Sequence, residues 1–199
     1  MPRALPATAA LLILSLGLAA CGGSERPSTG RAETAPEYSF NVDPELLSEE
    51  FADRGLGLRL SPPAEWSEAP SALREQIGAQ LTEAAPSADI EATLRALFVE
   101  RSSGSALVVY EPLERDDPGA VFDEWVGQAA ETAEFRHNGL RFFQARVVTE
   151  REVRFTLVTE AQDGSVAVIQ YFMPQSRFQE IGRSIESSIG SIAPFAGDD

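Results

Sequence analysis

The chain offers few side chains that could act as nucleophiles or soft metal ligands. Its 199 residues contain one cysteine, Cys21, and one histidine, His137. A single cysteine excludes a disulfide within the chain and any site built from several cysteines, and a single histidine disfavours a histidine-based zinc or iron site. His137 precedes the turn dipeptide Asn138-Gly139, so we expect an exposed turn histidine rather than a general base.

Cys21 stands at the end of an apolar segment. The run ATAALLILSLGLAA at 7–20 follows the basic Arg3; it has the proportions of a secretory signal and is shorter than the about 20 residues that span a bilayer. The ending Leu18-Ala19-Ala20-Cys21 resembles the lipobox of bacterial lipoproteins, in which a branched apolar residue and two small residues precede the cysteine. The resemblance implies that signal peptidase recognises Leu18, Ala19 and Ala20 and that the Cys21 thiol carries a diacylglycerol.

Lipidation at Cys21 would place the chain on a membrane of the cell envelope. Two or more acyl chains anchor a protein stably, whereas one does not. Gly22 rather than Asp follows the cysteine, and the sorting rule of lipoproteins then implies the outer membrane in a bacterium with two membranes. The alternatives are an ordinary cleaved signal peptide with a chance cysteine, and an uncleaved anchor helix.

The charge of the chain is strongly negative. Its 16 basic residues, all arginine, stand against 31 acidic residues, for a net charge of −15. The phosphate backbone would repel such a chain, so we exclude general nucleic-acid binding. Glu114, Asp116 and Asp117 could gather a hard cation, but Asp117 before Pro118 is better explained as a helix cap. We therefore expect neither a metal site nor a cofactor.

One part of this acidic chain is rich in arginine. Five arginines fall within nineteen residues: Arg136, Arg141, Arg146, Arg151 and Arg154. Arg141, Arg146 and Arg154 are the candidates for a basic patch that faces anionic lipid or an acidic partner. The favoured alternative is pairing with neighbouring acids such as Glu134, because odd and even positions of a strand lie on opposite faces.

Hydrophobic patterning predicts elements in the order β-α-β-β-α-β-β-β-α. Leu56, Leu58 and Leu60 alternate with polar or small residues, as in a strand, and further strands are predicted at 94–101, 106–111, 140–149, 153–159 and 165–172. Helices are predicted at 70–84, from Asp117 onward, and at 175–191, where Phe178, Ile181, Ile185 and Ile189 form one apolar stripe.

These elements predict an α+β fold with a mostly antiparallel sheet and helices on both faces. Hairpin connections make neighbouring strands antiparallel, and the runs at 107–110 and 166–172 are apolar on both sides, as in a sheet covered on both faces. The predicted organisation is a lipoprotein signal peptide at 1–20, lipidated Cys21 with a flexible tether to 45, a single domain at 46–193 and a tail at 194–199. Tyr38 and Phe40 are the tether's only aromatics and are candidates to pack on the domain.

The arrangement resembles the PsbP-like fold family over about residues 50–192. The likeness is carried by the strand and proline-tryptophan turn from Gly57 to Trp66, the meander from Gly139 to Phe172, and the closing helix through Ser187-Ser188-Ile189. It implies an α/β/α sandwich that serves as a non-enzymatic binding or adaptor domain. No metal-binding or partner-binding signature of the family can be carried over to particular residues.

The functional prediction is an envelope lipoprotein whose non-catalytic domain binds a protein partner. One alternative is a carrier of a small apolar ligand, which would need a cavity of at least about 300 Å³ between sheet and helices. A second alternative is a carboxylate-dependent or metal-dependent enzyme, which would need acids that converge in a cleft and have raised pKa values.

Overall fold

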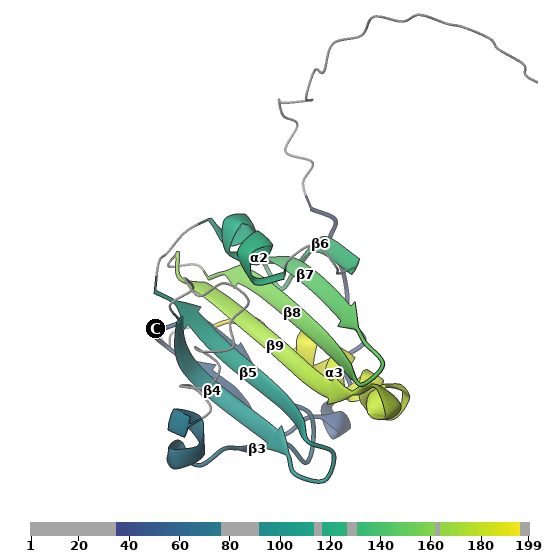
Figure 1. The fold of residues 1–199 in the computed structure, drawn as a ribbon. Helices are drawn as coiled ribbons and strands as arrows, with labels where there is room; N and C mark the ends of the chain where they lie inside the picture. The colour runs from purple at the N-terminus through teal and green to yellow at the C-terminus, as the bar shows by residue number, and fades with distance from the viewer. Residues whose placement is uncertain (1–34, 77–91, 114–116, 127–130, 162–163, 196–199) are drawn as a thin grey trace, which may run out of the picture. The chain divides into compact units, whose positions relative to one another are not determined.

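A computed structural model describes residues 35–76, 92–113, 117–126, 131–161 and 164–195. Its main feature is a seven-stranded sheet in the order β3-β4-β5-β9-β8-β7-β6 (Figure 1), in which every neighbouring pair is antiparallel. The strands are β3 (Ser67–Glu68), β4 (Ala92–Glu100), β5 (Ser105–Pro112), β6 (Glu131–His137), β7 (Leu140–Val148), β8 (Glu152–Glu160) and β9 (Val166–Pro174). The predicted α+β class with a mostly antiparallel sheet is confirmed.

Each face of the large sheet has its own apolar cluster. On one face, called here the α2 face, Val121 and Phe122 of helix α2 (Pro118–Val126) pack with sheet residues such as Val158 and Val168. On the other, the α3 face, Ile185 and Ile189 of helix α3 (Phe178–Gly190) pack with sheet residues such as Leu157 and Ile169. The predicted helices on both faces are therefore confirmed.

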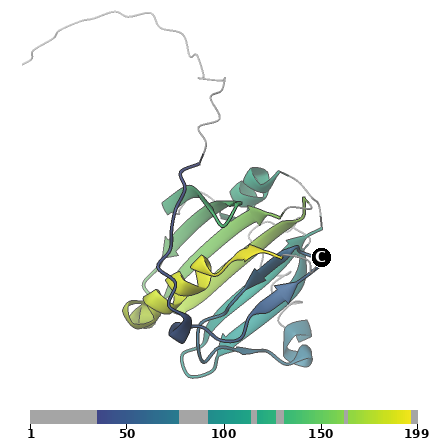
Figure 2. The same ribbon diagram turned by 180° about the vertical axis from the view of Figure 1, so that it is seen from behind.

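A second, small sheet shares the α3 face with α3. It has three antiparallel strands in the order β1-β2-β10: β1 (Phe51–Asp53), β2 (Leu58–Leu60) and β10 (Ala193–Pro194). Figure 2 shows its blue strands and the yellow α3 lying over the same side of the large sheet. The predicted opening strand thus exists as β2, but it belongs to this small sheet and not to the central one.

Four strands, β1, β3, β6 and β10, are not predicted from the sequence, and β3 has only two residues. β1 and β10 are only three and two residues long, and their pairing with β2 joins segments that lie far apart in the chain. β6 is an edge strand whose sequence, ETAEFRH, is largely polar and exposed, so it lacks the apolar alternation of a buried strand.

The predicted turn at Asn138-Gly139 is present between β6 and β7. Both residues have positive φ, 49° and 78°, as a two-residue hairpin turn requires.

The predicted helices are present where the structure describes them. The carboxylate of Asp117 accepts a hydrogen bond from the Ala120 amide at 3.2 Å, which is the expected cap of α2. A short 3-10 helix, η2 (Gln175–Arg177), leads into α3. Residues 71–76 are helical, and the rest of the predicted helix at 70–84 lies outside the described residues.

The folded domain begins earlier than the predicted boundary at residue 46. The Arg136 amide of β6 donates to the Pro36 carbonyl, and the Tyr38 amide donates to the Arg136 carbonyl, both at 2.8 Å. The 3-10 helix η1 (Pro44–Leu46) then leads toward β1. The described end of the expected tether is therefore bonded to the domain, and Tyr38 and Phe40 do pack on it, in ring contact with Phe135.

The predicted signal peptide at 1–20, Cys21 and residues 22–34 lie outside the described residues. Within the described part of the chain, no helix is both long and apolar enough to cross a membrane.

Candidate functional site

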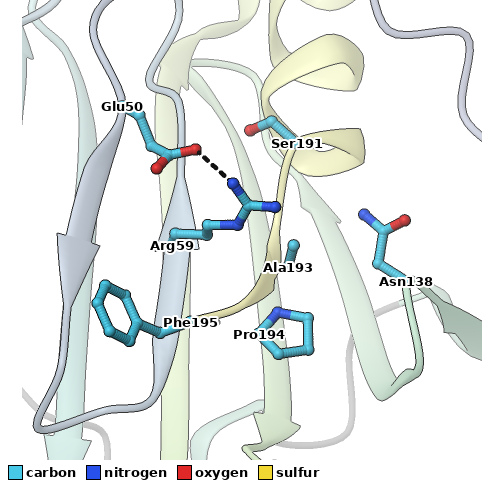
Figure 3. A pocket seen from close by; sticks show the side chains of 7 residues that line it. All are labelled: Glu50, Arg59, Asn138, Ser191, Ala193, Pro194 and Phe195. Carbon is cyan, nitrogen blue, oxygen red and sulfur yellow. Dashed lines mark hydrogen bonds and ion pairs between the residues drawn. The ribbon is translucent and has the colours of Figure 1, made fainter. Parts of the chain in front are cut away.

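A hollow of about 520 Å³ lies on the solvent-facing side of the small sheet (Figure 3). Its walls come from four separate stretches of the chain: the approach to β1, strand β2, the β6–β7 turn, and the segment from the end of α3 through β10. The lining residues are Glu50, Arg59, Asn138, Ser191, Ala193, Pro194 and Phe195. The hollow thus combines two opposite charges with amide, hydroxyl and aromatic groups.

The alternation of β2 explains why this face is hollow. Leu58 and Leu60 point into the core and are almost fully buried, so Arg59 between them points outward. The residues paired with Arg59 are Ala52 on β1 and Ala193 on β10. Two alanines beside one arginine leave space around the guanidinium that larger side chains would fill.

Arg59 forms an ion pair with Glu50 across this hollow. Its Nη1 lies 3.2 Å from the Glu50 Oε2, and both side chains remain roughly half exposed, at 44% and 48%. Exposed pairs of this kind contribute only about 0–1 kcal/mol. The Glu50–Arg59 pair is therefore weak and accessible to solvent.

The far wall of the hollow is held by side-chain hydrogen bonds to the main chain. Asn138 Nδ2 donates to the Ile192 carbonyl at 2.9 Å and lies 3.4 Å from the Gly190 carbonyl. Ser191 Oγ accepts from the Ser61 amide at 2.8 Å and donates to the Ser188 carbonyl at 2.6 Å. These bonds fix the 190–195 segment against both the β6–β7 turn and the small sheet, so the wall is preformed.

The remaining wall is aromatic. The Phe195 amide donates to the Gly57 carbonyl at 2.7 Å, and the Arg54 guanidinium lies 5.4 Å from the centre of the Phe195 ring. Such a cation–π contact helps to hold the ring in place at the rim. Phe195 therefore offers an apolar surface next to the Glu50–Arg59 pair.

The Ser191 hydroxyl is the one hydroxyl among the residues that line the hollow. Its hydrogen bonds within the described residues are made to main-chain groups of Ser61 and Ser188. Among the described residues no three His, Cys, Asp or Glu side chains come together as a metal site would require.

Asp53 and Glu100, two acidic groups outside the hollow, have pKa values that are lowered, whereas the enzyme alternative requires raised ones. Burial opposes ionisation of Asp53, but hydrogen bonds from Arg95 and from the Leu56 and Gly55 amides outweigh it and lower its pKa. Hydroxyl donors from Ser102 and Ser103 likewise lower the pKa of Glu100. Both shifts are opposite to those of a general acid at neutral pH.

His137 is not the exposed turn histidine that the sequence predicts. It is buried, with 9% of its surface exposed. Nδ1 lies 2.9 Å from the Tyr38 carbonyl oxygen and Nε2 lies 2.9 Å from that of Gly190. The prediction was wrong because residues 36–40 cover this end of the β6–β7 hairpin. The residues next to His137 in the sequence carry no pattern that predicts this long-range packing.

The three candidate arginines do not form one basic patch. Arg141 lies over the ring of Phe143 on the α2 face. Arg154 stands opposite Phe172 in the register of β8 and β9, so it lies on that same face. Arg146 stands opposite Phe155 in the register of β7 and β8, so it lies on the α3 face. Arg141 Nε also binds the Glu134 carboxylate at 2.7 Å, and Arg146 binds that of Glu131. Acidic neighbours thus neutralise two of the three, as the favoured alternative predicts for Arg141 and Glu134.

No local sequence pattern marks the hollow. Arg59 is recognisable as the outward residue of an alternating strand, but its neighbours from 138 and 191–195 reach it only through tertiary pairing. The predicted lipidation site Cys21 and its recognition residues Leu18, Ala19 and Ala20 lie outside the described residues. The hollow is also not the apolar cavity between sheet and helices that the carrier alternative requires, since it lies on the outer side of the small sheet and carries two charges.

Comparison with known proteins adds likeness at the level of the fold. No protein-family model and no curated protein matches the chain. The solution structure of cyanobacterial PsbP (CyanoP) from Synechocystis sp. PCC 6803 is similar, with a TM-score of 0.45 and 11% identity over 75% of this chain and 93% of that one. The crystal structure of LpqN, involved in cell envelope biogenesis of Mycobacterium tuberculosis, gives a TM-score of 0.40 and 12% identity over 73% and 90%. Neither likeness assigns a partner or an activity to this chain.

Proposed function

We propose that this protein is a lipoprotein of the cell envelope, anchored through acylated Cys21, whose folded domain binds a protein partner without catalysing a reaction. The anchor is supported by the sequence alone: a basic start, an apolar run and the ending Leu18-Ala19-Ala20-Cys21. The chain's only cysteine stands at the one position where lipidation requires it.

The observation that carries the binding role is the hollow on the small sheet. Glu50 and Arg59 offer charges of both signs within 3.2 Å of each other, and Phe195 offers an apolar ring beside them. Protein interfaces commonly combine aromatic and arginine anchors with surrounding polar groups. We infer that the partner presents a polypeptide segment with an acidic group for Arg59 and an apolar side chain for Phe195.

The test is capture of the partner from native membranes by a photo-crosslinking amino acid at position 193, in the floor of the hollow. One partner protein should be captured at this position, and the additional change Arg59→Glu should reduce its yield at least about tenfold. A matched control is Arg74→Glu. Arg74 forms a similar ion pair with Glu68, with 2.6 Å between Arg74 Nη1 and Glu68 Oε1, and neither residue lines the hollow. Equal capture from the Arg59 and Arg74 variants would contradict binding through the hollow.

A further inference from the structure

The segment at 36–42, called here the strap, crosses both the edge strand β6 and the C-terminal end of α3. Its N-terminal part pairs with Arg136 through two main-chain hydrogen bonds of 2.8 Å. Just beyond its other end, the Asp43 amide donates to the Ser187 hydroxyl of α3 at 3.2 Å. These hydrogen bonds join the strap and the residue that follows it to two different elements, β6 and α3.

His137 lies where the strap, the edge strand and the helix end meet. Its two ring nitrogens reach two carbonyl oxygens, Tyr38 of the strap and Gly190 of α3, each at 2.9 Å. The ring of Phe40 meets the imidazole edge-on, with 4.9 Å between ring centres. His137 thus links the strap to the end of the helix through a single buried side chain.

The two hydrogen-bond partners of His137 are both carbonyl oxygens. A carbonyl oxygen can only accept a hydrogen bond, and a neutral imidazole has one N–H to donate. Only the doubly protonated imidazolium can satisfy both carbonyls; the neutral ring leaves one nitrogen lone pair facing a carbonyl oxygen. The Gly190 carbonyl also belongs to the C-terminal end of a helix, where the partial negative charge favours a cation.

Other ionisable groups around His137 do not compete for its ring. Those on the strap, next to the turn of the β6–β7 hairpin and in the last two turns of α3 are Glu37, Tyr38, Arg136, Arg141, Arg183 and Glu186. In the described structure none of these side chains forms a hydrogen bond or ion pair with the imidazole. Arg136 and Arg141 occupy strand positions that face the opposite side of the sheet from His137. Within the described structure the ring nitrogens of His137 therefore contact the two carbonyl oxygens and no charged side chain.

We propose that His137 is a proton-dependent clasp that holds the strap on the domain. When the imidazole loses its second proton, one carbonyl loses its donor and the strap detaches more readily from β6 and α3. The strap has seven residues, so its release adds about 20 Å of extended chain between the domain and whatever precedes residue 36. For a chain tethered at Cys21, which rests on the proposed anchor, the clasp sets how far the domain reaches from the membrane.

The test is hydrogen exchange of the full chain in a neutral detergent across about pH 5 to 8, the range in which histidine usually changes charge. The amides of Tyr38 and Arg136, which form the strap's main-chain bonds, report on the strap; amides of the central β8–β9 pair serve as the internal reference. After correction for the intrinsic effect of pH on exchange, protection of the strap should fall at least about tenfold toward high pH, as expected for loss of one charge-assisted hydrogen bond. Protection of β8–β9 should stay constant.

The matched variant is His137→Gln, which is neutral at every pH and can donate from one nitrogen only. Its strap should be weakly protected throughout and show no pH response. Because the chain has a single histidine, the imidazole signals in an NMR titration of the same sample can be assigned without ambiguity. Strap protection in the native chain that does not change with pH, or an equal pH response in the Gln variant, would overturn the clasp. Neither readout depends on acylation, so failure of the clasp and failure of the anchor are distinguishable.

Discussion

The carboxylate of Asp53 and the guanidinium of Arg95 form a two-pronged ion pair between the two sheets. Arg95 Nε lies 2.9 Å from Asp53 Oδ2, and Arg95 Nη2 lies 2.7 Å from Asp53 Oδ1. Asp53 belongs to β1 and Arg95 to β4, and the Asp53 side chain is only 14% exposed. Paired, partly buried hydrogen bonds of this geometry are stronger than exposed ion pairs, so this contact helps to fix the small sheet on the large one.

We expect Asp53→Asn to lower the free energy of unfolding by about 1–3 kcal/mol, because an amide offers only one acceptor oxygen and leaves a partly buried donor of Arg95 poorly bonded. Urea unfolding measures the change. The control is Glu68→Gln, which removes the exposed pair with Arg74 and should cost less than about 1 kcal/mol. Equal losses in the two variants would refute a special role for the Asp53–Arg95 contact.

The lowered pKa values of Asp53 and Glu100 predict an acid-sensitive fold. The unfolded chain takes up protons on these groups at a higher pH than the folded chain does. The two carboxylates therefore stabilise the fold fully above the pKa values that carboxyl groups have in an unfolded chain, about 4–4.5. This stabilisation is lost as the pH falls through their lowered pKa values in the folded chain. Unfolding free energies measured from pH 7 downward should fall in this window, and the fall should be shallower in Asp53→Asn; an identical slope would contradict the assignment.

Gly190 allows the strap to cross the end of α3. A Cβ atom at this position would lie 2.5 Å from Phe40 Cβ and 2.7 Å from Val42 Cγ2, too close for either to stay in place. Gly190→Ala should therefore displace the strap, cost about 1–3 kcal/mol and raise hydrogen exchange at Tyr38.

Gly182 is the matched control in the same helix, since its added Cβ would meet only Phe178 Cε2 at an ordinary 3.8 Å. Gly182→Ala should be neutral or stabilise by about 0.5–1 kcal/mol, because alanine is the better helix former. An unchanged rate of hydrogen exchange at the Tyr38 amide in Gly190→Ala would contradict a close contact between the strap and the end of α3.

A buried hydroxyl chain connects β9, α3 and the small sheet. The Tyr171 hydroxyl lies 2.9 Å from Ser188 Oγ, which donates to the Ser61 carbonyl at 2.7 Å. Tyr171 is completely buried, and this burial raises the pKa of its phenol. Tyr171→Phe keeps the ring and should cost about 0.5–1.5 kcal/mol in urea unfolding. Tyr38→Phe, at a half-exposed position, is the control and should cost less; the reverse order would contradict the buried chain.

The sequence was sufficient for features set by local pattern. The α3 stripe, the cap at Asp117 and the hairpin at Asn138-Gly139 follow from residue spacing and turn chemistry. Each depends only on residues that lie close together in the sequence. It was insufficient where distant segments meet. Neither the two residues of β10 nor the polar strand β6 carries a periodic signal.

The candidate site was missed for the same reason. Arg59 becomes part of a hollow only because Ala52 and Ala193 pair beside it. The clasp at His137 likewise depends on carbonyl groups of Tyr38 and Gly190, 99 and 53 residues away in the chain. Such contacts leave no trace in the residues next to the histidine.

The most direct test of the account is intact-mass analysis of the protein extracted from its native membranes. We predict a chain that begins at Cys21 and carries a diacylglycerol on the thiol, and Cys21→Ser should abolish that added mass. A processed chain without lipid at Cys21, still retained by the membrane, would contradict the central claim that acyl chains hold this domain in the envelope.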